Sequence, residues 1–85
     1  MRLRSEQILD ADVGDEVVVL DRRRNVYLGI NATGATMWPL LKRGCQEDDL
    51  VDALVAAYDV DSADAAMDVA TFLQSLRERH LLDDD

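Results

Sequence analysis

The chain has 85 residues, of which 48% are hydrophobic, and a formal net charge of −9 at neutral pH. This length predicts a single domain over residues 1–85 with a small core, and the acidic balance argues against binding to nucleic acid or anionic lipid through overall charge. No apolar run is long enough to span a membrane, no signal segment is recognisable, and the single cysteine, Cys45, fits a reducing compartment, so we expect a cytoplasmic location.

Three short strands are predicted in the first part of the chain. Residues 3–10 alternate weakly between apolar and polar positions and form the first strand, and residues 12–15 supply turn chemistry. Residues 16–21 carry a β-branched run of strand length. The arginines at 22–24 fall in a polar hairpin tip, where we expect them to be solvated. The returning strand is residues 26–30.

The alternation of the third strand places Val26, Leu28 and Ile30 on one face. Tyr27 and Gly29 lie on the other face, and Gly29 has no side chain to keep another backbone at a distance. If this strand lies at the edge of the sheet, its unpaired N–H and C=O groups are available to a guest peptide that adds as a further strand. The third strand is therefore a candidate peptide-binding edge.

The hydrophobic period then changes from two to 3.6 residues, which predicts a helix over residues 32–43. Asn31 or Thr33 is its expected N-cap. Pro39 removes one backbone hydrogen bond, so either the regular helix begins near Thr36 or the helix is kinked. The apolar face of this helix consists of Met37, Trp38, Leu40 and Leu41.

Two further helices are predicted over residues 47–58 and 63–80. Acidic residues in the first turn of the former favour the helix dipole, and one of residues 61–62 caps the latter. Residues 81–82 are expected to fold back onto the core and residues 83–85 to form a solvated tail. The apolar stripes expected to pack in the core are Leu50, Val51, Leu54, Val55 and Tyr58, followed by Val69, Phe72, Leu73 and Leu76.

This order of elements predicts the fold class. A three-stranded antiparallel sheet followed by three helices is an α+β domain that resembles a winged helix-turn-helix. Such a domain raises the alternative of DNA binding, which requires basic or amide side chains on a recognition helix. Residues 47–58 contain no basic residue, and in residues 63–80 the acidic Asp64, Asp68 and Glu78 oppose two arginines. The charge pattern therefore disfavours nucleic acid.

Few groups in the sequence are suited to chemistry. His80 is the only histidine and Cys45 the only cysteine, and no third group is identifiable that would orient them as a nucleophilic pair. The acidic loop residues lack EF-hand spacing, and the glycine-containing stretch before the first helix lacks the lysine of a phosphate loop. We therefore predict that the protein is not an enzyme and has no catalytic residue, metal site or cofactor. Trp38 is expected in the core, whereas Phe72 sits at the edge of its stripe, where it can line a groove.

The sequence resembles the PqqD-like family, the RiPP recognition elements, and within it the small stand-alone proteins of lasso peptide biosynthesis. The resemblance covers roughly residues 5 to 82, and its motifs form an ordered set rather than one diagnostic signature. Pro39 departs from the usual polar residue after the tryptophan, and His80 stands where glycine is common. The residues that carry the resemblance are Tyr27-Leu28, Ile30-Asn31, Thr33-Gly34, Trp38, Leu40-Leu41, Tyr58-Asp59-Val60, Asp68-Val69, Phe72-Leu73, Leu76 and Leu81-Leu82.

The resemblance implies a binding function. Members of this family bind the leader segment of a ribosomally made precursor peptide as an added strand, between the third strand and the third helix. In lasso pathways such a protein resembles a non-catalytic adaptor that presents the precursor to a separate leader peptidase, with a cyclase acting afterwards. The alternatives are a chaperone of the PQQ precursor peptide and a winged-helix regulator acting through DNA or protein contacts. A homodimer through the free edge is a further alternative.

These considerations predict a set of peptide-binding residues. The third strand would give register through its backbone, Leu28, Ile30, Val69 and Phe72 would form apolar pockets, and acidic residues would line the rim. The sequence does not decide whether the Asp68 flank or the Met67 flank of the third helix faces the strand. The predicted peptide-binding residues are Val26, Tyr27, Leu28, Gly29, Ile30, Asp64, Met67, Asp68, Val69, Thr71, Phe72 and Ser75.

Overall fold

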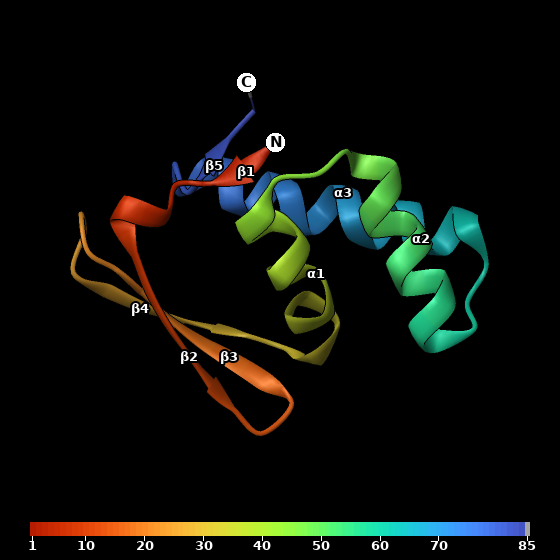
Figure 1. The fold of residues 1–85 in the computed structure, drawn as a ribbon, viewed down its shortest axis with the longest axis horizontal. Coiled ribbons are helices and arrows are strands. Elements are labelled where there is room, and N and C mark those ends of the chain that lie inside the picture. The colour runs from red at the N-terminus through yellow and green to blue at the C-terminus, as the bar shows by residue number, and fades with distance from the viewer. Residues whose placement is uncertain (85) are drawn as a thin grey trace.

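The computed structural model describes residues 1–84 and confirms the predicted fold class. A three-stranded antiparallel sheet of order β2-β3-β4 is followed by three helices (Figure 1). The β2–β3 hairpin projects away from the helices, and the two ends of the chain lie close together on the opposite side (Figure 1). The elements are β1 (Arg2–Leu3), the 3-10 helix η1 (Ser5–Gln7), β2 (Ile8–Val13), β3 (Glu16–Asp21), β4 (Val26–Ile30), α1 (Ala32–Arg43), α2 (Glu47–Tyr58), α3 (Ser62–Glu78) and β5 (Leu82–Asp83).

The core lies between the inner face of the sheet and the helices. Val17 and Val19 of the central strand β3 are buried and pair with Ile30 and Leu28 of β4. Strand alternation therefore directs these side chains towards the helices. The large buried side chains that the helices contribute are Met37, Trp38, Leu41, Leu50, Leu54, Val69, Leu73 and Leu76.

Helix α1 begins directly after Asn31, one of its two predicted N-cap residues. The side chain of Asn31 accepts a hydrogen bond of 3.0 Å from the Gly34 backbone N–H, and Gly44 ends the helix with φ of 94°. Pro39 lies inside an uninterrupted α1, so the expectation of a late start near Thr36 is wrong. The cap and the burial of Trp38 and its neighbours offset the hydrogen bond that the proline removes.

The first strand lies further along the chain than predicted. The structure places β2 at residues 8–13 rather than 3–10, because η1 occupies residues 5–7 and Leu3 pairs with Leu82 in a separate two-stranded sheet. Val13 pairs with Glu16, so the turn is confined to the two residues between them. The arginines at 22–24 are exposed at the β3–β4 turn, as expected.

The end of the chain differs in part from the prediction. Helix α3 ends at Glu78 rather than His80, because His80 adopts a left-handed conformation with φ of 58°. The return to the core is confirmed, since Leu81 and Leu82 are buried. Within the predicted tail, Asp83 pairs with Arg2 in the β5–β1 sheet, Asp84 accepts two hydrogen bonds of 3.0 Å from Arg77, and residue 85 lies outside the described residues.

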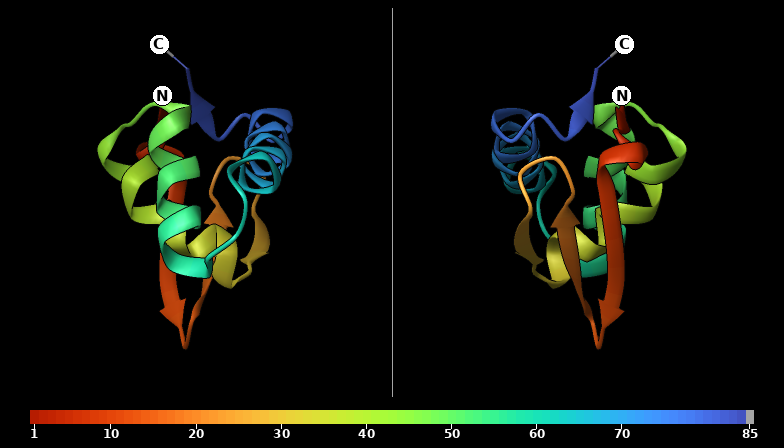
Figure 2. Two further views of the ribbon diagram at one scale, coloured as in Figure 1. Left: turned by 90° about the vertical axis from the view of Figure 1, so that its right-hand side faces the viewer. Right: turned by 90° about the vertical axis from the view of Figure 1, so that its left-hand side faces the viewer.

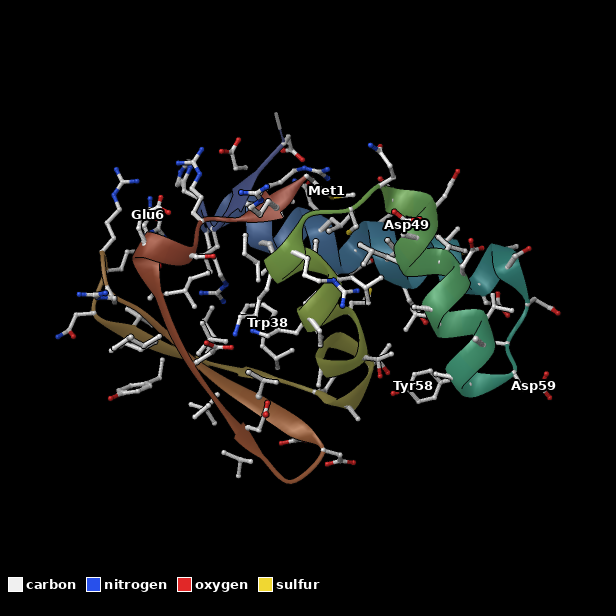
Figure 3. All side chains as sticks on the ribbon, viewed as in Figure 1. Met1, Glu6, Trp38, Asp49, Tyr58 and Asp59 are labelled. Carbon is white, nitrogen blue, oxygen red and sulfur yellow. The ribbon has the colours of Figure 1, made fainter. Side chains whose placement is uncertain are left out.

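Tyr58 does not pack in the core as predicted. Its side chain, at the end of α2 (Figure 3), is 42% exposed. Its hydroxyl donates to the Ala32 carbonyl at 3.1 Å and lies 2.9 Å from Thr36 Oγ1. Tyr58 is the last residue of α2. At this end of α2, the apolar stripe of the helix passes the first turn of α1 rather than the buried face of α1, which explains the exposure of Tyr58. Tyr58 therefore ties the two helices together through polar contacts.

Trp38 is held by a hydrogen bond to a carboxylate as well as by packing. Its side chain lies between α1 and the sheet (Figure 3) and is buried. Its indole Nε1–H donates to Asp10 Oδ2 at 2.8 Å. Lys42 Nζ lies 3.1 Å from the same oxygen. Partial burial pushes the pKa of Asp10 upwards, but the hydrogen bonds from Trp38 and Lys42 outweigh it, and the pKa is lowered overall. The contact joins β2 to α1.

Replacing Asp10 with alanine is expected to lower the free energy of unfolding by about 1–3 kcal/mol at neutral pH, because the indole N–H loses its partner. A lowered folded-state pKa stabilises the protein above the ordinary aspartate pKa of about 4, and this contribution disappears as the pH falls through the folded-state value. Urea denaturation at several pH values should therefore show the difference between wild type and Asp10→Ala shrinking in acid. A constant difference would contradict the ionic role.

Candidate functional site

Strand β4 forms one edge of the sheet. It pairs with β3 on one side only, so alternate backbone N–H and C=O groups on its other side have no strand partner. The opposite edge, β2, is close to α1, and the hollow beside Trp38 there has a volume of only about 30 Å³. The β4 edge therefore has more space beside it for the side chains of an added strand.

Two adjoining hollows lie along α3, one between α3 and β4 and the other between α3 and the start of α1, and together we call them the β4–α3 groove. They share Phe72 and Ser75, and β4 and α3 lie on the same side of the molecule (Figure 2). The hollow along β4 has a volume of about 310 Å³ and is lined by Tyr27, Leu28, Gly29, Ile30, Phe72, Ser75, Leu76 and Arg79. The hollow beside the start of α1 measures about 390 Å³ and is lined by Asn31, Thr33, Gly34, Met37, Asp68, Thr71, Phe72 and Ser75.

Gly34 allows the two walls of the groove to meet at its floor. A Cβ atom at this position would lie 2.6 Å from Ile30 Cγ2 and 3.0 Å from Phe72 Cε1. Both distances are shorter than normal carbon contacts of about 3.5–4.0 Å. The absence of a side chain at Gly34 therefore lets the last residue of β4 and the Phe72 ring of α3 pack on the first turn of α1.

Gly34→Ala is expected to destabilise the protein by about 1–3 kcal/mol through overpacking, although alanine is the better helix former by about 1 kcal/mol. Gly29→Ala is the matched control, because a Cβ at Gly29 would have no neighbour within 4 Å. Thermal and urea unfolding of both variants measure the effect. Equal stability of the two variants would show that the close packing at the groove floor is unimportant.

The structure brings most of the predicted site residues into one place. Tyr27, Leu28, Gly29 and Ile30 line the groove from β4, and Asp68, Thr71, Phe72 and Ser75 line it from α3. Phe72 and Ser75, which line the hollow along β4, lie one and two helical turns after Asp68. The flank of α3 that faces β4 is therefore the Asp68 flank, which the sequence left undecided.

Four predicted site residues do not line the groove. Val69 is completely buried in the core, and so cannot form a pocket wall on the surface. Met67 is 69% exposed, and lies outside both hollows. Val26 at the start of β4 and Asp64 one turn before Asp68 are also absent from the lining.

Six lining residues were not predicted from the sequence. Leu76 and Arg79 continue the row of Asp68, Phe72 and Ser75 at helical spacing, so the 3.6-residue period was a signal for them. The other four depend on how α1 sits against α3, for which the sequence offers no local signal. They are Asn31, Thr33, Gly34 and Met37.

The structure bears on the cysteine and on metal binding among the described residues. Partial burial, and then the neighbouring Asp49 carboxylate, raise the pKa of the Cys45 thiol, which favours the unreactive protonated form. Residues 1–84 contain no group of three or more histidine, cysteine, aspartate or glutamate side chains placed to hold a metal ion. None of the helices in this part of the chain is long and apolar enough to cross a membrane.

The fold and the site define a small α+β domain with a free edge strand facing a helix across a groove, an arrangement that suits an extended peptide. Residues 16–82 match the family model described as coenzyme PQQ synthesis protein D (PqqD). The chain belongs to the PqqD family. The comparison with curated proteins found no match.

Two solved structures are similar to this chain over nearly its whole length. One is described as TbiB1 in complex with the TbiA(beta) leader peptide; it is 34% identical, with a TM-score of 0.89, and the match covers 100% of this chain and 98% of that one. The other is described as lasso peptide synthetase B1 complexed with the leader peptide; it is 32% identical, with a TM-score of 0.80 and coverage of 94% and 93%. Both similar proteins were therefore solved with a leader peptide bound.

Proposed function

We propose that this protein is a non-catalytic adaptor that binds the leader segment of a ribosomally synthesised precursor peptide, that of a lasso peptide. The leader adds as a strand beside β4, and its side chains enter the β4–α3 groove. The adaptor then presents the precursor to a separate leader peptidase, and a cyclase acts afterwards. We expect these steps in the cytoplasm, where the precursor is made.

The observation that carries this proposal is the free edge of β4 next to the groove. Backbone pairing along a strand of five residues gives register and affinity, and the groove selects alternate side chains of the guest. Leu28 is partly buried and Ile30 is buried at its end, so β4 presents an apolar wall rather than a charged one. The leader peptides bound to TbiB1 and to lasso peptide synthetase B1 support the same class of guest.

A second guest is favoured by the family match alone. The matching model is described as a PQQ synthesis protein, so the precursor peptide of PQQ is the alternative occupant of the same groove. The structural similarity to a lasso peptide synthetase B1 bound to its leader peptide favours the lasso precursor.

A binding titration tests the proposal. The leader peptide bound to lasso peptide synthetase B1, labelled with fluorescein, should bind this protein with a Kd in the micromolar range or below, whereas the core segment of the same precursor should not bind. The PQQ precursor peptide and a DNA duplex at low salt serve as competing probes. Tight, steeply salt-dependent binding of the duplex, without leader binding, would instead indicate a winged-helix regulator.

A further inference from the structure

The two ends of the β4–α3 groove carry opposite charges. Arg79 is the only charged residue in the lining of the hollow along β4, and Asp68 is the only one in the lining of the hollow beside α1. Both are exposed, and within residues 1–84 neither side chain makes a hydrogen bond or ion pair. By contrast, the neighbouring Arg77 is already paired with Asp84 at 3.0 Å.

The spacing of these charges fits a strand. Asp68 of α3 and Arg79, the residue that caps the end of α3, are 11 positions apart, which corresponds to roughly 16 Å along a helix. A strand covers the same distance in about five residues. Because alternate side chains of a strand point to the same face, the two guest positions nearest to these charges are about four or six residues apart.

We propose that the groove selects guests by the order of their charges: an acidic side chain beside Arg79 and a basic side chain beside Asp68, four or six residues apart. This inference rests on the proposed strand addition. The net charge of −9 favours basic guests in general, so an acidic position in the guest is not explained by overall charge. It requires a local cation, which Arg79 supplies.

Selection from a library of random twelve-residue peptides tests the inference. The wild-type protein should enrich peptides with one acidic and one basic position, four or six residues apart. The Arg79→Glu variant should enrich peptides with a basic residue at the position that is acidic in the wild-type selection, and with the other position unchanged. The Asp68→Lys variant should enrich peptides with an acidic residue at the position that is basic in the wild-type selection. Arg43→Glu and Asp52→Lys are matched controls, because they change the net charge equally at exposed positions outside the groove lining, and they should enrich the wild-type pattern.

Titrations with the enriched peptide measure how much the pairing of its charges with Arg79 and Asp68 contributes to affinity. Reversing either charge of the peptide should weaken binding roughly threefold to tenfold, as for partly solvated ion pairs, and the matching reversal in the protein should restore it to within about twofold. Enriched peptides without these charges that still lose affinity on Phe72→Ala would overturn the charge rule and leave strand addition standing. Peptides whose affinity does not depend on Phe72 would show that the groove is not the binding site, and the proposed function itself would fail.

Discussion

Phe72→Ala is expected to weaken leader binding by about 1–3 kcal/mol, whereas Met67→Ala is expected to leave it unchanged. Phe72 lines both hollows of the β4–α3 groove, and truncating an aromatic side chain at the centre of an interface has effects of this size. Met67 is a large apolar residue on the same helix, but it lies outside both hollows. Fluorescence anisotropy with a labelled leader peptide measures both variants.

The fold should survive both substitutions. Phe72 is only partly buried at the margin of the core, so its loss costs less than the roughly 3–5 kcal/mol of a fully buried phenylalanine. Circular dichroism and thermal unfolding confirm that the variants are folded before they are titrated. Weaker binding by Met67→Ala together with full affinity of Phe72→Ala would place the guest on the other flank of α3.

Trp38→Ala is expected to have the largest effect on stability, about 3–5 kcal/mol. The side chain is 3% exposed and joins α1 to β2 through Asp10. Small domains have a total stability of about 5–15 kcal/mol, so this variant should be largely unfolded on mild heating. The reason is the loss of both the packed indole and the hydrogen bond to the Asp10 carboxylate.

Trp38→Phe separates the two contributions, because it keeps an aromatic ring and removes the N–H donor. It should cost about 1–3 kcal/mol, the penalty for removing one partner of a partly buried hydrogen bond. Urea unfolding must be followed by circular dichroism, since Trp38 is the only tryptophan in the chain. If Trp38→Ala and Trp38→Phe lower the free energy of unfolding equally, packing of the aromatic ring contributes nothing to stability at this position.

Local signals explain why much of the fold was predictable. Asn31 caps α1 as its residue type suggests, and the change of hydrophobic period after Ile30 separates sheet from helices at the correct place. The β1–β5 sheet carried no such signal. Its two strands have two residues each and pair ends of the chain that are about 80 residues apart, so only the tertiary fold creates it.

The β4–α3 groove was predictable only where a local sequence pattern marks its walls. The alternation of β4 and the helical row through Asp68 and Phe72 identified both walls of the groove. Periodicity alone did not decide which flank of α3 faces β4, because Met67 and Asp68 both border the buried stripe through Val69. It also did not reveal Gly34, whose role depends on the approach of Ile30 and Phe72 from different elements.

The central claim is that the guest binds as a strand of the sheet. In a strand, the N–H and C=O groups of every second residue point towards the same adjacent strand. The most direct measurement therefore uses two leader peptides, each N-methylated at a different alternate set of residues, titrated against the wild-type protein. Strand addition to β4 predicts that one set weakens binding by about 100-fold or more, since several hydrogen bonds of about 1 kcal/mol each are lost, and that the other changes it little. Equal binding by both peptides would contradict strand addition and leave only side-chain contacts in the groove.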